Sequence, residues 1–443
     1  DTAYAAKNVT GPTDLWNCNY GKCDAQFGVP AVGQGAHNKV NGAGCTQGHQ
    51  TATDPSQPCT YEDALFEQRI THVINNHTNT AEEKPLFLFW STHIVHGPLQ
   101  VPQAELNNFT SFIPDKTRAT YHAMVHWIDG AIGRVTLLMK EKGLWENTLM
   151  VLSADNGGKL SSSLSLSLSL VRSLSLLCAL TLACSLAPSL FLSLSFSLSS
   201  LSIGPIGGGS NNFPLRGGKF SNWEGGIRVN AFVSGGFLPP IARGTVQSGL
   251  IAGWDWYATF AGLAGVDPTD HRAAAAGLPP IDSIDVWPLV SSGMNGTSPR
   301  TQLVIGSNVG GDDSGRTSGN TTIGGIIVMP LKILLGYGND LTIDYAGWTG
   351  PHHPNATNPG NGGWTNITQV CGRTAATGCL YDIESDPYEY NNLAATQPLD
   401  WERLYAIAME EEKKVFSPQR GSKDPKACKA VEKNGGFWGP FMP

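Results

Sequence analysis

Two short apolar segments separated by one long amphipathic helix constrain the fold of this chain most strongly. Residues 86–90 read Leu-Phe-Leu-Phe-Trp, and residues 148–153 read Thr-Leu-Met-Val-Leu-Ser. Between them, residues 119–142 repeat apolar side chains at helical spacing, and Gly143 ends the predicted helix. Continuous apolar runs are typical of strands buried on both faces of a parallel sheet. The order strand, helix, strand therefore predicts a βαβ unit and an α/β domain.

Further apolar patterns predict additional elements on both sides of this unit. Residues 60–76 form a predicted helix in which Thr60 and Asp63 resemble a capping pair. A strand is expected over residues 227–234 and a helix over residues 254–264. Beyond about residue 300, shorter apolar runs and a late helix indicate a smaller α+β domain, with a Gly/Pro/Asn-rich loop inside it. These segments are Ile326–Leu335, Leu380–Ile383, the helix Trp401–Val415 and the loop Tyr345–Thr365.

A low-complexity segment, here called the Ser/Leu block, covers residues 161–203 and contains one charged residue, Arg172. Its Ser/Leu alternation is too long for an ordinary strand. Residues 174–196 are long and uncharged enough for a membrane span, although Ser-rich and interrupted by Pro188. A translated CT dinucleotide repeat or unspliced intron also gives alternating Leu and Ser. We favour this repeat or artefact over a disordered or membrane-touching insertion. The block contributes to the low charged fraction of 15%.

Composition excludes some functions and indicates a compartment. The 41% hydrophobic residues and 12 Trp exclude global disorder, and the net charge of −7 argues against a nucleic-acid partner. None of the nine cysteines forms a zinc-type CxxC pair. Seven Asn-x-Ser/Thr sequons favour a secreted or lumenal glycoprotein. The chain starts with Asp and shows no signal peptide, so we expect a cleaved pre-segment or a fragment that lacks one disulfide partner.

Polar groups follow the strand predicted over residues 148–153. Asp155 and Asn156 precede two glycines there. Ligands of doubly wound sheets bind beyond the carboxyl ends of the strands. A carboxylate beside an amide oxygen suits a hard cation such as Ca²⁺, although such a site needs about six or more oxygens. A plain turn after a strand is the alternative interpretation.

Two further clusters carry candidate chemistry. His96 stands before Gly-Pro, where the first apolar run gives way to a loop, whereas His93 lies closer to that run and is expected to be a packed neighbour. Residues 211–226 form a glycine-rich segment that places the cations of Arg216 and Lys219 where an anion could approach the backbone. The alternative is a surface loop anchored by its Trp and Glu.

In this order the clusters resemble the sulfatase family. The resemblance rests on Pro-Leu-Phe-Leu-Phe, on His96-x-Pro-Leu-Gln, on Asp155-Asn156-Gly-Gly, and on Pro-Leu-Arg-Gly-x-Lys219 followed by Trp-Glu-Gly-Gly. Leu-Tyr-Asp-Ile-Glu-Ser-Asp-Pro at residues 380–387 resembles the family's C-terminal strand. The tail Phe-Trp-Gly-Pro-Phe-Met is similar to that of the arylsulfatase B (N-acetylgalactosamine-4-sulfatase) branch.

This resemblance implies an alkaline-phosphatase-like α/β sandwich with a mostly parallel central sheet, plus a small C-terminal α+β domain with an antiparallel sheet. It implies hydrolysis of sulfate esters of sugars or aryl alcohols around one Ca²⁺, by a formylglycine nucleophile. Asp155 and Asn156 match calcium ligands of the family. Lys219 matches the lysine that holds the sulfate, and His96 matches the histidine beside it, which protonates the leaving alcohol or binds sulfate oxygens.

The chain also departs from the family pattern. Cys-x-Pro-x-Arg and Ser-x-Pro-x-Arg, which carry the formylglycine, do not occur in the 443 residues, and neither does the early Asp-Asp metal pair. Cys428 resembles a tail cysteine whose partner belongs to the missing region. We therefore expect residues 1–310 to be a partial catalytic domain, with residues 159–206 an insertion, and residues 311–443 a C-terminal subdomain.

Three functions remain open at this stage. The first is a secreted or lysosomal sulfatase of which this chain is a part that cannot turn over alone. The second is a phosphatase or phosphodiesterase of the same superfamily, although the Pro-Leu-Arg-Gly-x-Lys segment argues against it. The third is a catalytically dead sulfatase or carbohydrate-binding remnant. The sequence does not identify the sulfated substrate, and a membrane or nucleic-acid partner is not expected.

Overall fold

The computed structural model describes part of the chain, and the contacts divide it into two compact units. The first unit comprises residues 1–144, 354–357 and 420–443, and the second comprises residues 145–353 and 358–419. The described residues are 17–19, 22–24, 61–78, 85–96, 99, 101–158, 210–219, 221–307, 323–336, 341–343, 346–348 and 368–414. The Ser/Leu block, the Cys428 tail and most of the loop expected over Tyr345–Thr365 lie outside them.

The first unit is built around the long helix α4 (Lys116–Glu141), which the sequence predicts. The carboxylate of Asp115 accepts a hydrogen bond from the backbone amide of Arg118, 2.7 Å away, and so caps the start of the helix. Gly143 has φ = 70° just beyond the end, as expected for a helix-terminating glycine. The helices α2 (Glu62–Asn76) and α3 (Gln103–Thr110) pack against α4.

The predicted capping pair at the start of α2 includes Thr60, which lies outside the described residues, so the pair stays a prediction. Tyr61 precedes the first helical residue, and its side chain makes no capping hydrogen bond. The carboxylate of Asp63 accepts a hydrogen bond from the hydroxyl of Thr92, 2.5 Å away. The ring of Tyr61 packs edge-on against Trp127 of α4 with 5.0 Å between centroids, so an aromatic contact fixes this end of α2.

Residues 86–90 are assigned neither helix nor strand, so the expected strand buried on both faces is not found there. Leu88 and Trp90 pack against apolar side chains of α2 and α4. Phe87 and Phe89 are 71% and 81% exposed. Successive side chains of an extended chain point to opposite sides, and no described strand is hydrogen-bonded to this segment. Helices therefore cover one of its faces and leave the other uncovered.

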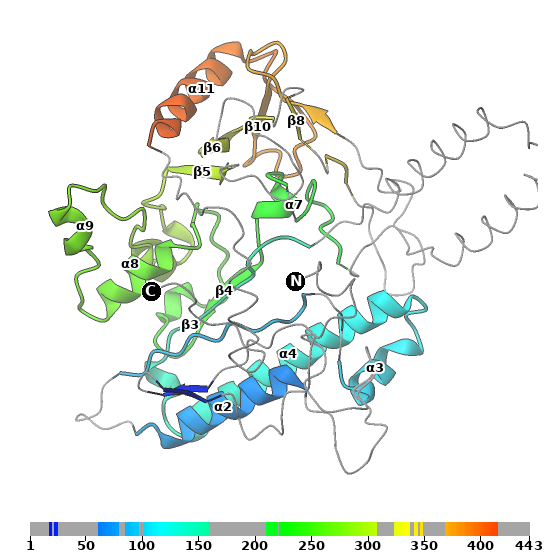
Figure 1. The fold of residues 1–443 in the computed structure, drawn as a ribbon, viewed down its shortest axis with the longest axis vertical. Helices are drawn as coiled ribbons and strands as arrows, with labels where there is room; N and C mark the ends of the chain where they lie inside the picture. Colours follow the sequence, from blue (N-terminus) through cyan, green and yellow to red (C-terminus); the bar gives the residue numbers. More distant parts are fainter. Residues whose placement is uncertain are drawn as a thin grey trace, which may run out of the picture. The chain divides into compact units, whose positions relative to one another are not determined.

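The second unit contains a four-stranded antiparallel sheet in the order β10-β7-β6-β5 (Figure 1). The apolar run over residues 326–335 belongs to a hairpin in which Ile326 pairs with Ile333. This sheet and its helix confirm the predicted α+β character of the C-terminal region. The elements are β5 (Gln302–Ser307), β6 (Ile323–Val328), β7 (Leu331–Leu334), β10 (Cys379–Asp382) and α11 (Pro398–Glu412).

The two faces of this sheet have different partners. One face packs against α11 through the apolar side chains of Ile326, Ile333, Leu380, Trp401 and Leu404. Strand neighbours alternate between faces, so Lys332 and Tyr381 point the other way. There the ring of Tyr381 meets the fully buried Trp223 at 5.8 Å between centroids. The glycine-rich segment thus lies on the face opposite α11.

A separate antiparallel ribbon joins β3 (Met150–Ser153) to β4 (Ala231–Ser234), with Val151 opposite Val233. Both strands fall where the sequence predicts strands. Strand pairs within the described ranges are all antiparallel, so the parallel central sheet stays a prediction. The expected domain boundary at residue 310 falls among residues 308–322, outside the described residues, and also stays a prediction.

The remaining elements are short, apart from the predicted helix α8 (Asp255–Leu263). Within the described part of the chain, no helix combines the length and apolar character needed to cross a membrane. The short helices are α7 (Glu224–Ile227), α9 (His271–Ala275), α10 (Trp287–Ser291), η1 (Trp145–Asn147), η2 (Pro240–Ala242) and η3 (Gly293–Asn295). The short strands are β1 (Asn17–Asn19), β2 (Lys22–Asp24), β8 (Thr342–Ile343) and β9 (Gln369–Val370).

Candidate functional site

The loop after β3 and the glycine-rich segment are fastened together by backbone hydrogen bonds. The amide of Lys219 donates to the carbonyl oxygen of Gly158 at 2.9 Å, and the amide of Gly157 donates to Gly226 at the same distance. These contacts, together with Asn212, are called the glycine clasp below. The clasp brings the chain carrying Asp155 and Asn156 beside the chain carrying Lys219.

Asn212 completes the clasp with its side chain. Its Oδ1 accepts a hydrogen bond from the amide of Gly158 at 2.8 Å, and its Nδ2 donates to the Gly158 carbonyl at 2.9 Å. The same Nδ2 donates to the carbonyl of Gly217 at 3.2 Å. The sequence does not predict that Asn212 bridges the two loops, because the only local signal is an Asn at the start of a glycine-rich segment.

The glycines of both loops are needed for close approach of one backbone to another. A Cβ on Gly157 would lie 1.7 Å from the carbonyl oxygen of Gly225. A Cβ on Gly225 would lie 2.5 Å from the carbonyl oxygen of Arg216. Real Cβ atoms do not come this near, so any side chain here would separate the loops. Backbone packing thus explains glycines that the sequence analysis associated with an anion.

Asp155 is exposed and Asn156 partly buried in the bend directly after β3. A carboxylate and an amide oxygen are ligand types that Ca²⁺ prefers, but Ca²⁺ takes six to eight oxygens. Among the described residues, no group of three or more His, Cys, Asp or Glu is arranged to hold a metal ion. The donor types fit calcium, although two residues would supply only part of the required set.

His96, the fourth candidate site residue, belongs to the first unit, whereas the clasp belongs to the second. It is exposed, and its backbone amide donates to the carbonyl of His93 at 2.8 Å. The ring of His93 meets Phe66 edge-on at 5.8 Å, the kind of contact expected of a packed neighbour. The clasp brings the loops of Asp155, Asn156 and Lys219 together, and the partnership of His96 with them stays a prediction.

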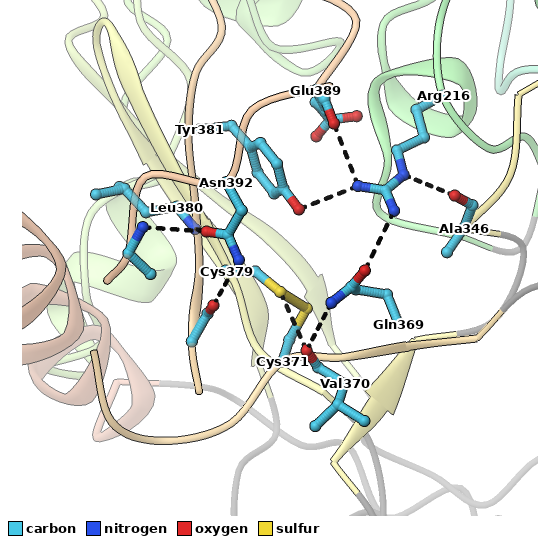
Figure 2. Close-up of a disulfide and its surroundings, with 12 residues drawn as sticks. Arg216, Ala346, Gln369, Val370, Cys371, Cys379, Leu380, Tyr381, Glu389 and Asn392 are labelled. Carbon is cyan, nitrogen blue, oxygen red and sulfur yellow. Dashed lines mark hydrogen bonds between the residues drawn. A yellow bond between two sulfur atoms is a disulfide. The ribbon is translucent and has the colours of Figure 1, made fainter. Parts of the chain in front are cut away.

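Arg216 does not provide the exposed positive charge that the sequence analysis expects of it. Its side chain is buried, and its guanidinium lies 3.7 Å from the ring centroid of Trp223 and 4.3 Å from that of Trp348. The guanidinium donates to protein acceptors (Figure 2), namely the Ala346 carbonyl at 2.7 Å, Tyr381 Oη at 3.0 Å, the Glu389 carbonyl at 3.2 Å and Gln369 Oε1 at 3.4 Å. Arg216 is therefore a structural residue.

A disulfide between Cys371 and Cys379 supports the same neighbourhood (Figure 2). It joins the chain after β9 to the start of β10. Gln369 lies on β9 and Tyr381 on β10, and both accept hydrogen bonds from Arg216. The cross-link therefore holds two acceptors of the Arg216 guanidinium in place.

A buried ion cluster ties the glycine-rich segment to the sheet. The ammonium of Lys332 on β7 lies 2.7 Å from Glu224 Oε1 and 2.8 Å from Glu389 Oε1, and all three side chains are at most 4% exposed. The other carboxylate oxygen of Glu389 accepts a hydrogen bond from the backbone amide of Glu224 at 2.8 Å. The Glu expected to anchor the segment is thus Glu224, and its partners come from distant parts of the chain.

The charges of this cluster perturb one another. Burial raises the pKa of Glu389, and the nearby Lys332 opposes that shift without cancelling it. Burial alone would lower the pKa of Lys332, but the two carboxylates outweigh it and the pKa is raised. Lys332 stays charged, and Glu389 takes up a proton at a higher pH than an exposed glutamate does.

Comparison with known proteins identifies relatives of this chain. The sulfatase family model matches residues 6–266. Mouse arylsulfatase J (Mus musculus) is 29% identical over 392 residues, which cover 86% of this chain and 53% of that protein. Mouse N-acetylgalactosamine-6-sulfatase is 25% identical over 217 residues, or 49% of this chain and 30% of that protein. The solved structure of Ps i-CgsB with k-i-k-neocarrahexaose shares the fold, with a TM-score of 0.52 at 19% identity, covering 86% of this chain and 60% of that one.

The family match covers more than half of the chain, so the chain belongs to the sulfatase family. The two curated relatives are longer, and the chain spans about half of arylsulfatase J and a third of N-acetylgalactosamine-6-sulfatase.

Proposed function

We propose that this chain is part of an enzyme that hydrolyses sulfate esters of sugars. The observation that carries the proposal is the hydrogen bond between Lys219 and Gly158, which joins the loop of the expected sulfate-binding lysine to the loop of the expected metal ligands. The named activities of the relatives, arylsulfatase J and N-acetylgalactosamine-6-sulfatase, support a sulfate ester as substrate. The resemblance to the arylsulfatase B (N-acetylgalactosamine-4-sulfatase) branch adds a sulfated N-acetylgalactosamine as the proposed substrate.

In this proposal Lys219 binds the sulfate group. Its ammonium is a compact positive charge that neutralises an anionic oxygen of the ester. The clasp fixes the backbone of Lys219 and so limits the positions its side chain can reach. His96 either donates a proton to the leaving alcohol or binds sulfate oxygens, since an imidazole can serve in both ways near neutral pH.

Asp155 and Asn156 would supply two oxygen ligands to one Ca²⁺, with further ligands from elsewhere in the protein. When bound, such an ion stabilises negative charge on the sulfate oxygens. The nucleophile of the family, a formylglycine, would come from a Cys/Ser-x-Pro-x-Arg motif outside these 443 residues. The chain alone is therefore proposed to be inactive.

The proposed fold and compartment follow the same reasoning. The described residues of the catalytic region would belong to an alkaline-phosphatase-like domain with a mostly parallel central sheet, followed by the C-terminal subdomain. The disulfide Cys371–Cys379 and the sequons support a secreted or lysosomal compartment, because disulfides persist in oxidising environments.

The test uses the protein translated from the complete transcript, beside the 443-residue chain as a matched control. The longer protein should release sulfate from an aryl sulfate, and Lys219→Ala should reduce kcat/KM at least a hundredfold. The 443-residue chain should release none. Faster hydrolysis of an aryl phosphate than of the aryl sulfate would identify a phosphatase instead. A complete transcript without the Cys/Ser-x-Pro-x-Arg motif, and without sulfate release, would leave a catalytically dead relative.

A further inference from the structure

The turn Tyr388–Glu389–Tyr390 combines a strained backbone with exposed aromatic rings. Glu389 is fully buried in the ion cluster and has φ = 58°, a conformation that L residues rarely adopt. Its neighbours Tyr388 and Tyr390 are 38% and 54% exposed. Strained residues cluster at functional sites, where the surrounding contacts hold them. Here the buried carboxylate holds a turn that keeps two tyrosines at the surface.

The two tyrosines form a well-supported corner, called the aromatic corner below. Their rings meet at 65° with centroids 5.9 Å apart. Tyr390 stacks on Trp348 at 4.9 Å, and the indole nitrogen of Trp348 donates to the carbonyl of Tyr388 at 2.7 Å. Trp348 in turn stacks on the guanidinium of buried Arg216. Packing against Trp348 and Arg216 therefore holds the aromatic corner in place without a ligand.

The aromatic corner is also near the glycine clasp. Arg216 forms an isolated β-bridge with Trp348, and the amide of Gly217 donates to the carbonyl of Gly347 at 2.9 Å. Three residues of chain lead from Arg216 to Lys219, which span at most about 11 Å. No more than about 11 Å of chain thus separates Lys219 from Arg216, the β-bridge partner of Trp348.

We propose that the aromatic corner binds a pyranose ring of a sulfated oligosaccharide whose sulfate ester lies at Lys219. The face of an aromatic ring is electron-rich, and the C–H face of a pyranose carries small positive charges, so the two attract. The ring hydroxyls of the sugar stay at the rim, where water can bond them. This inference rests on the proposed function and adds a sugar subsite to it.

The size of the corner favours a sugar over a protein partner. The exposed surface of Tyr388 and Tyr390 amounts to roughly 200 Å², taking 150–250 Å² for a whole aromatic side chain. A stable protein interface buries about 800 Å² on each partner. One or two sugar rings match the smaller area.

The test measures binding by calorimetry, so that it does not depend on turnover. The full 443-residue chain is titrated with k-i-k-neocarrahexaose and with its desulfated counterpart. Tyr390→Ala should weaken the binding of both sugars about tenfold, whereas Tyr390→Phe keeps the stacking surface and should bind like the unchanged chain. The matched control is Tyr257→Ala on α8, since Tyr257 is 57% exposed away from the corner and should have no effect. Lys219→Ala should weaken only the sulfated sugar.

The two proposals fail in different ways. Unchanged binding by Tyr390→Ala, with Lys219→Ala still weakening the sulfated sugar, would overturn the corner and leave the proposed function standing. Weaker binding by Tyr390→Ala, with no effect of Lys219→Ala on the sulfated sugar, would support the aromatic corner as a sugar site. It would count against Lys219 as the sulfate-binding residue. Absence of binding by the unchanged chain would overturn the corner as well. A dimer in size-exclusion chromatography that Tyr390→Ala dissociates would show that a second copy occupies the corner instead.

Discussion

The backbone amide of Lys219 lies 2.9 Å from the carbonyl oxygen of Gly158, although the whole Ser/Leu block separates the two residues in the sequence. The described residues on either side of the block also meet, since a Cβ on Gly158 would lie 2.4 Å from the Cβ of Ser210. The chain therefore leaves the clasp and returns to it at one place.

Excision of residues 160–209, with a six-residue Gly/Ser linker in their place, should preserve the fold of the second unit. The entropic cost of closing a connection falls by about 0.6 kcal/mol for each halving of its length, so the shorter connection should stabilise the chain by up to about 2 kcal/mol. Urea unfolding with a far-ultraviolet dichroism readout measures this. A control deletion that extends through Asn212 removes the side chain that bridges the clasp and should destabilise the chain. Loss of cooperative unfolding in the first variant would contradict the prediction.

Gly157→Ala should open the clasp, because its Cβ would lie 1.7 Å from a backbone oxygen that has no room to move aside. We expect a loss of about 3 kcal/mol or more in the free energy of unfolding. Gly133→Ala on α4 is the matched control. Nothing lies within 4 Å of its Cβ, and alanine favours a helix over glycine, so it should stabilise by about 0.5–1 kcal/mol. Equal effects of the two variants in urea denaturation would refute the role of the clasp.

Arg216→Lys should destabilise the chain by about 2–3 kcal/mol although the charge is kept. A lysine cannot lie flat between Trp223 and Trp348, and its three N–H donors cannot reproduce the planar fork that serves acceptors on several segments. Arg403→Lys, in an exposed pair with Asp400, should change the stability by less than about 0.5 kcal/mol. Chemical unfolding of both variants makes the comparison, and a small loss for Arg216→Lys would assign it a different role.

Local patterns predicted the long helices α4, α8 and α11 and the strands β3 and β10, since these depend on apolar spacing and end signals within one segment. The prediction of a strand buried on both faces over residues 86–90 failed because apolar character does not reveal whether one face or two are covered. The prediction of an exposed charge at Arg216 failed for a similar reason. Its acceptors come from residues 346–389, and no pattern near Arg216 indicates them.

The assignment of Asp155, Asn156 and Lys219 as site residues rests on the order of motifs along the chain and stays a prediction. The clasp shows that the loops carrying these residues meet. Lys332 and Glu389 were missed because a single charged residue in a strand or turn predicts an exposed side chain. Their burial results from pairing across the fold.

The ion cluster should give stability a particular pH dependence. The pKa of Glu389 is higher in the folded chain than its ordinary value of 4.5. The stability that this group contributes is therefore complete below about pH 4.5 and is lost as the pH rises through its folded pKa. Lys332 also has a raised pKa, but from an ordinary value of 10.5, so its effect falls at higher pH.

Glu389→Gln separates this effect from packing, because glutamine resembles the protonated carboxylic acid and does not titrate. The free energy of unfolding of the unchanged chain, relative to that of Glu389→Gln, should fall as the pH rises above about 4.5 in urea titrations. Glu389→Ala should lose about 3–5 kcal/mol at every pH, since Lys332 then lacks one of its two carboxylates. Glu410→Gln is the control with the opposite pH dependence. Lys413 lowers the pKa of the exposed Glu410, so the stability that Glu410 contributes is lost as the pH falls. Parallel pH profiles for the unchanged chain and Glu389→Gln would mean that folding leaves the pKa of Glu389 unshifted, with Lys332 compensating its burial completely.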